Sequence, residues 1–262
     1  MHATLPIYLI IGWFGLAIGS FLNVVIYRLP RNLGLVMERS KCTRCGTQLK
    51  WYHNVPLLSF LVLRGKCGFC HAPISWRYPL VEAATSALFL FFLWHFGLTV
   101  NFGIFAFLSA VLLAIFFIDL DFQIIPDSLT LPGMVLGLIV SLLPNGIGIM
   151  SSAIGLVVGG GALYLVALLG DALFKKESMG GGDIKMTAML GAFLGWQKVL
   201  LIFISSAVFG LIVSAAMMVF SAKLRKERII PFGPFLAMGA FLAMAYGDRI
   251  VQFYIDNFLR AN

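Results

Sequence analysis

Long apolar runs recur along the whole chain, separated by short polar or glycine-rich stretches. Several runs reach the roughly 20 residues that an α-helix needs to cross about 30 Å of hydrocarbon. The pattern predicts membrane spans near residues 5–27, 79–97, 102–118, 129–144, 150–170, 184–196, 199–222 and 231–247. We therefore expect an all-α fold, a polytopic membrane bundle of about eight transmembrane helices.

The composition agrees with a membrane protein. Of the 262 residues, 60% are hydrophobic and only 11% are charged, and the mean hydropathy is +0.96. A soluble domain carries about 25% charged residues, so packing in water does not explain this chain.

The basic residues predict the topology. Nine of the 19 Lys and Arg lie in 28–78, three in 171–185 and four in 222–230, which are alternate loops of the eight-span arrangement. Since basic loops face the cytoplasm, these loops are expected inside, together with 119–128, and both termini outside. The net charge of +8 thus indicates contact with anionic membrane lipid rather than with nucleic acid.

All four cysteines lie in the first basic loop, in two C-x-x-C pairs, Cys42 with Cys45 and Cys67 with Cys70. Two such turns close a tetrahedral zinc site of the structural kind. The alternatives are two disulfides, which a reducing cytoplasm disfavours, or a histidine ligand, His53 or His71, in place of one thiolate. We expect a structural Zn²⁺ held by the four cysteines.

The loop around the cysteines predicts a small domain of its own. It has little aliphatic core, so metal binding would supply the missing folding free energy. We predict three parts: 1–27 as the first transmembrane helix, 28–78 as a small cytoplasmic zinc-binding loop domain, and 79–262 as the membrane-embedded bundle.

Acidic residues are scarce, eleven in all, and four of them lie at the predicted cytoplasmic edge: Asp119, Asp121, Asp127 and Asp183. Asp183 follows three glycines, which would let the backbone approach a substrate closely. A bland alternative is that Asp183 only complements the positive N-terminal end of its helix. Two carboxyl groups brought together in a partly dry site share one proton, which is aspartic-protease chemistry.

Several motifs together resemble a known family. They are the stretch from Gly19 to Pro30, both C-x-x-C pairs, Arg77 to Glu82, Ile118 to Asp121 with Pro126 and Asp127, and Met179 to Lys185. In this order they resemble the bacterial type IV prepilin peptidases, or leader peptidase/N-methyltransferases, of the G-x-G-D membrane aspartic proteases.

The resemblance implies an enzyme with two activities. It would cleave the basic leader from prepilins or pseudopilins of type IV pili and type II secretion after a glycine, and methylate the new amino terminus with S-adenosylmethionine. The catalytic pair would be Asp119 and Asp183, with Asp127 as the rival for the first position. Asp127 follows Pro126 and is a candidate helix cap.

The resemblance further implies a bacterial inner membrane protein with its active site at the cytoplasmic face. The candidates for binding S-adenosylmethionine are Asn23, Arg28 and Glu82, although helix anchoring, helix pairing and an ion pair with Arg77 would also explain them. Two other functions stay open: a peptidase of the preflagellin type without methylation, and a non-catalytic scaffold or transporter with a zinc cap.

Overall fold

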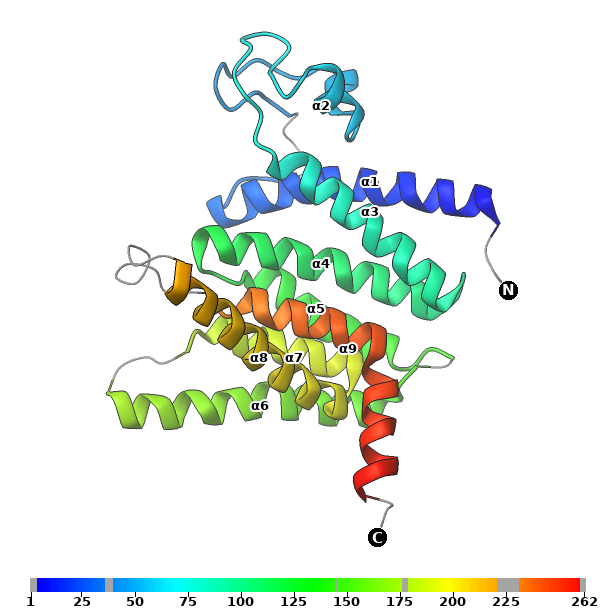
Figure 1. The fold of residues 1–262 in the computed structure, drawn as a ribbon, viewed down its shortest axis with the longest axis vertical. Helices are drawn as coiled ribbons and strands as arrows, with labels where there is room; N and C mark the ends of the chain where they lie inside the picture. Colours follow the sequence, from blue (N-terminus) through cyan, green and yellow to red (C-terminus); the bar gives the residue numbers. More distant parts are fainter. Residues whose placement is uncertain (1–3, 36–39, 145, 176–178, 221–230, 260–262) are drawn as a thin grey trace. The chain divides into compact units, whose positions relative to one another are not determined.

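The computed structural model describes residues 4–35, 40–144, 146–175, 179–220 and 231–259 (Figure 1). Within these ranges the chain is helical and contains no named strand. The α-helices are α1 (Leu5–Arg28), α2 (Leu58–Val62), α3 (Arg77–Phe96), α4 (Val100–Phe122), α5 (Asp127–Val140), α6 (Ile149–Phe174), α7 (Gly181–Leu194), α8 (Trp196–Phe220) and α9 (Gly233–Tyr254). Short 3₁₀ or π turns are η1 (Leu29–Arg31), η2 (Trp51–Asn54) and η3 (Ile255–Leu259).

The expected all-α membrane protein is confirmed, because each predicted span corresponds to a helix and five of these helices are long and apolar enough to cross a membrane. In the described chain, α1, α3, α4, α6 and α8 are long and apolar enough to cross a membrane. By contrast, α5 and α7 have 14 residues each, so at about 1.5 Å per residue they fall short of the hydrocarbon thickness. The basic stretch 222–230 lies outside the described residues, and the orientation of the spans stays a prediction.

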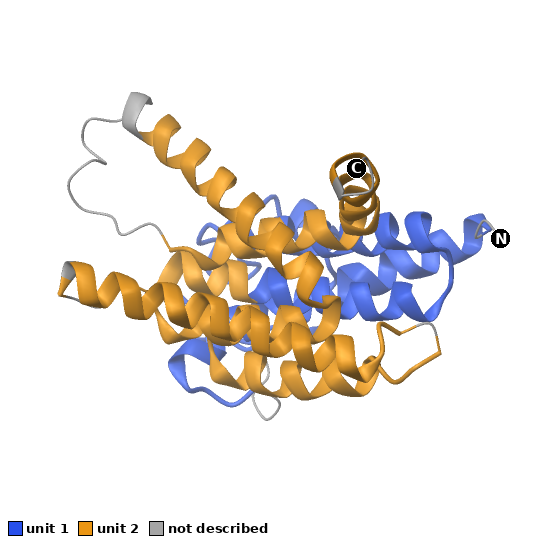
Figure 2. Ribbon diagram, turned by 90° about the horizontal axis from the view of Figure 1, so that it is seen from below, with its two compact units in different colours: residues 1–114 blue, residues 115–262 orange. Residues whose placement is uncertain are grey.

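By their contacts, the residues form two compact units, 1–114 and 115–262 (Figure 2). The boundary falls within α4. The first unit contains the cysteine loop with α1 and α3, and the second contains the three aspartates considered for catalysis. The predicted division at residues 27 and 78 stays a prediction.

In the first unit, α1 packs closely against α3 through small residues. A Cβ added at Gly15 would lie 2.7 Å from the Cα of Ser86, and one added at Gly19 would lie 2.6 Å from the Cα of Glu82. The two backbones therefore approach in a way that only glycine permits, as in many membrane helix pairs. This approach buries Glu82, which is 7% exposed.

In the second unit, α7 lies between α5 and α6 and packs against both. Gly155 of α6 and Gly191 of α7 meet backbone to backbone, and Gly159 contacts the carbonyl of Thr187 in the same way. The Ser152 hydroxyl donates a hydrogen bond of 2.6 Å across this contact to the carbonyl of Ala192. Close packing on both sides thus holds α7, the helix that carries Asp183 in its first turn, in place.

Candidate active site

Asp119 lies in the last turn of α4 and is 5% exposed. Its carboxylate accepts a hydrogen bond of 3.0 Å from the backbone N–H of Gly233, the first residue of α9. The helix ends just beyond Asp119, where Gln123 adopts a left-handed conformation with φ of 55°. The end of one helix and the start of another thus hold the Asp119 side chain.

Asp183 lies in the first turn of α7, directly after the glycines that begin this helix. Its Oδ1 is buried and has no hydrogen-bond partner within the described structure. Burial, together with the nearby charge of Asp119, raises the pKa of the Asp183 carboxyl to about 7; the residue itself lies outside the five helices that qualify as spans. The two carboxyl groups are therefore close enough to affect each other's ionisation.

Asp127 has a different environment from the other two aspartates. It is the first residue of α5, and Pro126 occupies the cap position before it. Its two carboxylate oxygens accept hydrogen bonds of 2.8 and 2.7 Å from Lys185, and both side chains are partly exposed. Because a lysine neutralises it, Asp127 is poorly suited to share a proton with Asp183.

The arrangement of Asp119 and Asp183 suits acid–base chemistry on a peptide bond. Two nearby carboxyl groups in a partly dry site hold one proton between them at neutral pH. The unpartnered Oδ1 of Asp183 is then free to bond a water molecule or a substrate carbonyl. Reasoning from the sequence named both residues, but it missed the contribution of Gly233.

Gly233 is required by the close approach of α9 to Asp119. A Cβ added there would lie 2.5 Å from Oδ2 of Asp119 and 3.2 Å from the side chain of Ile125. The only sequence signal is a glycine directly before Pro234 at the start of an apolar run. That signal predicts a helix start, but not the carboxylate 114 residues away that it contacts.

Replacing Gly233 with Ala is expected to lower peptide cleavage by about 100-fold, since a displaced catalytic group costs about that much per ångström. Gly161→Ala is the matched control, because an added Cβ at Gly161 of α6 meets nothing within 4 Å. The measurement compares the cleavage rates of the two variants and the midpoint temperatures of their thermal unfolding. Equal rates at equal stability would mean that Asp119 does not need this contact.

The four cysteines come together in the first unit. Their sulfur atoms all lie within 4.8 Å of one another, and the Sγ atoms of Cys42 and Cys70 are 3.8 Å apart. Zn–S bonds of about 2.3 Å in a tetrahedron require sulfurs about 3.8 Å apart, so the four thiols fit a zinc ion. All four are free cysteines, as a metal site requires and two disulfides would not allow.

The two cysteine pairs lie on matching turns. Each turn is closed by an antiparallel bridge, Lys41 with Gln48 and Lys66 with Pro73. The residue after the second cysteine is left-handed in both, with φ of 70° at Gly46 and 56° at His71. His71 therefore has a conformational role in the turn, and the sulfurs complete a ligand set without it.

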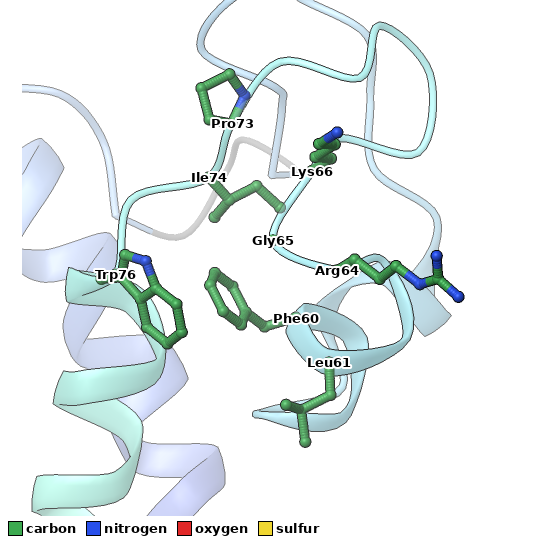
Figure 3. Close-up of a pocket in the computed structure, with 8 residues that line it drawn as sticks. All are labelled: Phe60, Leu61, Arg64, Gly65, Lys66, Pro73, Ile74 and Trp76. Carbon is green, nitrogen blue, oxygen red and sulfur yellow. The ribbon is translucent and has the colours of Figure 1, made fainter.

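Little apolar packing supports this loop. Figure 3 shows Phe60 facing Ile74 and Trp76, with Arg64 extending away from them. The rings of Phe60 and Trp76 have centroids 4.9 Å apart, yet Trp76 remains 76% exposed. Such a small cluster cannot fold a loop of about 50 residues by itself, so a metal held by the four cysteines would be its main stabilising element.

The three candidates for binding S-adenosylmethionine line one cavity of about 990 Å³ in the first unit. The amide of Asn23 donates to the carbonyls of Gly19 and Tyr78, at 3.3 and 3.1 Å. The Arg28 guanidinium donates to the carbonyl of Gly34 at 3.1 Å, and Glu82 accepts the N–H of Leu57 at 2.8 Å. The cavity is within the size range of small-molecule sites.

Comparison with known proteins gives a consistent result over both units. A family model described as the bacterial peptidase A24 N-terminal domain matches residues 13–96, and the model of the type IV leader peptidase family matches 106–215. The chain is 38% identical to the prepilin leader peptidase/N-methyltransferase of Legionella pneumophila, over 95% of the chain and 94% of the relative. It is 40% identical to that of Stutzerimonas stutzeri, over 92% and 91%. No solved structure matches the chain.

Long apolar helices, two coupled carboxyl groups at helix ends and a cluster of four cysteines together fit a membrane-embedded peptidase. The chain belongs to the type IV leader peptidase family, and it is an enzyme of this family. Its match also covers the N-terminal cysteine-loop region, and the relatives named above are peptidases and N-methyltransferases. The monofunctional and non-catalytic alternatives are therefore not favoured.

Proposed function

We propose that the chain removes the basic leader of type IV prepilins or pseudopilins after a glycine, with Asp119 and Asp183 as the catalytic pair. The observation that carries the proposal is the electrostatic coupling of these two carboxyl groups at the ends of α4 and α7. The names of the relatives supply the substrate class. Asp127 is left out of the pair because Lys185 holds it in an ion pair.

In the proposed reaction, the ionised carboxylate takes a proton from a water molecule, whose oxygen attacks the carbonyl carbon of the glycine itself. The protonated carboxyl donates a hydrogen bond to the carbonyl oxygen. The tetrahedral intermediate then breaks its C–N bond, and the leaving amine takes a proton from the pair. The N–H of Gly233 keeps Asp119 oriented throughout.

The second proposed activity is methylation of the amino group that cleavage exposes, with S-adenosylmethionine as methyl donor. Asn23, Arg28 and Glu82 are the proposed residues for it, since all three line the same cavity. A structural Zn²⁺ on Cys42, Cys45, Cys67 and Cys70 would shape one wall, because Cys42 and Cys67 also line that cavity.

We further propose the bacterial inner membrane as the location, with the active site at the cytoplasmic face and both termini outside. The support is the distribution of Lys and Arg along the sequence. A pilin helix would enter from the lipid, with its leader in the cytoplasm and its cleavage site at the membrane edge. Anionic lipid would attract both the basic leader and the basic loop of this chain.

The proposal is tested with the detergent-purified full chain, a prepilin that carries its leader, and S-adenosylmethionine. Mass spectrometry should show loss of the leader and then a gain of one methyl group that depends on the cofactor. Cleavage without methyl gain would leave only the peptidase, and no cleavage of several prepilins by a folded, zinc-loaded sample would contradict the proposed function.

Cleavage is also expected to depend on pH. Since the pKa of Asp183 is raised to about 7 by burial and by Asp119, its proton is present below pH 7 and is lost above it. A mechanism that needs this proton predicts a rate that falls by about tenfold per pH unit above neutrality. Initial cleavage rates between pH 6 and 9 measure this, and a rate that keeps rising to pH 9 would contradict an acid role for Asp183.

A further inference from the structure

The charged side chains along the wall of the cavity in the first unit are mainly basic but include the carboxyl group of Glu82. The ionisable residues along its wall are Tyr27, Arg28, Lys41, Cys42, Arg44, His53, Cys67, Arg77, Tyr78 and Glu82. Among the described residues that line it, Glu82 is therefore the one acid. Residues 1–114 contain nine Lys and Arg but only two acids, Glu38 and Glu82, so a carboxylate here is not part of a mixed, charged surface.

Glu82 is buried, and among the described residues it forms no ion pair. Its carboxylate accepts hydrogen bonds from the N–H of Leu57, at 2.8 Å, and from the hydroxyl of Ser20. Both donors are neutral, so the hydrogen bonds orient the carboxylate without neutralising it. Burying an ionised carboxylate is costly unless a cation or several donors compensate it, and such groups therefore tend to serve a function.

Contacts from two other segments of the chain hold the Glu82 carboxylate in position. Gly19 lets α1 approach the backbone of α3 at Glu82, and Leu57 adopts a positive φ of 56°, with ψ of -47°, as it directs its N–H to the carboxylate. A leucine in that conformation is uncommon and strained. Three segments thus converge on one oxygen-bearing side chain at a cavity that can accommodate a small ligand.

Methylation of an amine requires a base, and a carboxylate can be that base. An α-amino group has a pKa of about 8, so at neutral pH most of it is the ammonium form, which has no lone pair to attack a methyl group. A base must take one proton before the nitrogen can react. Glu82 offers a negative charge for the ammonium and an oxygen for its proton.

We propose that Glu82 binds the amino terminus of the cleaved pilin and acts as the general base for its methylation. This inference rests on the methyl transfer proposed above. The carboxylate takes one proton from the ammonium. The nitrogen lone pair then forms a bond to the methyl carbon, the carbon–sulfur bond breaks, and its electron pair stays on sulfur as a neutral thioether. The methylated nitrogen has gained one carbon, and Glu82 later releases its proton to solvent.

The first test uses Glu82→Gln with a peptide that begins at the mature pilin terminus, so that leader cleavage is not needed. Glutamine keeps an oxygen for the N–H of Leu57 but removes the charge. We expect about 100-fold slower methylation at pH 7, with a rate that rises about fivefold by pH 8 as the amine loses its proton in solution. The parent enzyme should show a much weaker dependence. Asp248→Asn, which removes an exposed carboxylate paired with Lys198, is the control and should behave like the parent.

The other possible results of this methylation assay distinguish the role of Glu82 from the methyl transfer itself. If the parent itself fails to methylate the peptide, the proposed methyl transfer is wrong, whatever the variant does. If the parent methylates and Glu82→Gln matches it, only the role of Glu82 is overturned. A loss that does not change with pH would indicate a structural role, and a tenfold weaker affinity for S-adenosylmethionine, measured by calorimetry, would assign Glu82 to the cofactor instead.

A second test uses the parent protein, so that a variant that loses zinc or does not fold cannot obscure the answer. A hydrophobic carbodiimide modifies buried carboxyl groups, and mass spectrometry locates the adduct. The mature-terminus peptide should protect Glu82, whereas its N-acetylated form, which has no ammonium, should not. Equal protection by both peptides, or by neither, would overturn the proposal.

Discussion

Asp183→Asn is expected to reduce leader cleavage by roughly 10⁴-fold, and Asp119→Asn to reduce it equally. The amide keeps the shape of each side chain but cannot hold or transfer the shared proton. Since the two carboxyl groups act as one unit, the double variant should be no slower than either single variant. Cleavage of a prepilin, followed by mass in single-turnover conditions, measures the three rates.

Asp127→Asn is the discriminating control for this experiment. It makes the same chemical change at the same edge of the second unit, but to a carboxylate that forms an ion pair with Lys185. An ion pair this exposed contributes at most about 1 kcal/mol, so cleavage should fall by less than tenfold. A loss as large as that of Asp183→Asn would replace Asp119 by Asp127 in the proposed pair.

The sequence predicted the helices well because long apolar runs determine where they lie. The helix predicted at 79–97 is observed as α3, Arg77–Phe96, and that at 199–222 as α8, Trp196–Phe220. The predicted ranges for α5 and α7, 129–144 and 184–196, were also short, but both observed helices begin and end two to four residues earlier in the chain. The end of α7 is set locally by Gly195, which has a φ of 82°, whereas the packing of Gly191 against Gly155 is a tertiary contact that no local pattern reveals.

Residues with proposed chemical roles could be predicted where they belong to a sequence motif. They could not be predicted where only a tertiary contact gives them the role. Two C-x-x-C pairs predicted the cysteine cluster, whose sulfurs do converge. In contrast, Asp119 and Glu82 each accept a hydrogen bond from a backbone amide, at Gly233 and Leu57. Every residue except proline has a backbone N–H, so the sequence does not reveal which of these groups will donate a hydrogen bond to a carboxylate. Only the fold shows that.

Removal of the metal is expected to abolish methyl transfer while cleavage falls by less than tenfold. Binding of a structural zinc contributes about 10–16 kcal/mol to folding in zinc-finger peptides, far more than the apolar cluster of Phe60, Ile74 and Trp76 can replace. Without zinc the turns that carry Cys42 and Cys67 would open, and with them the wall of the cavity. The proposed catalytic pair belongs to the second unit and has no ligand in common with the metal.

Cys67→Ser is the variant for this prediction, because Cys67 is the buried member of the cluster. Elemental analysis should find one zinc per parent chain and none in the variant, and limited proteolysis should cut the variant within 40–75. His71→Asn is the matched control: asparagine accepts the left-handed conformation found there, so zinc should be retained if the four thiolates are the ligands. Loss of zinc from His71→Asn, or its retention in Cys67→Ser, would show a different ligand set. Equal loss of cleavage and methylation in Cys67→Ser would mean that the zinc loop supports both reactions rather than one.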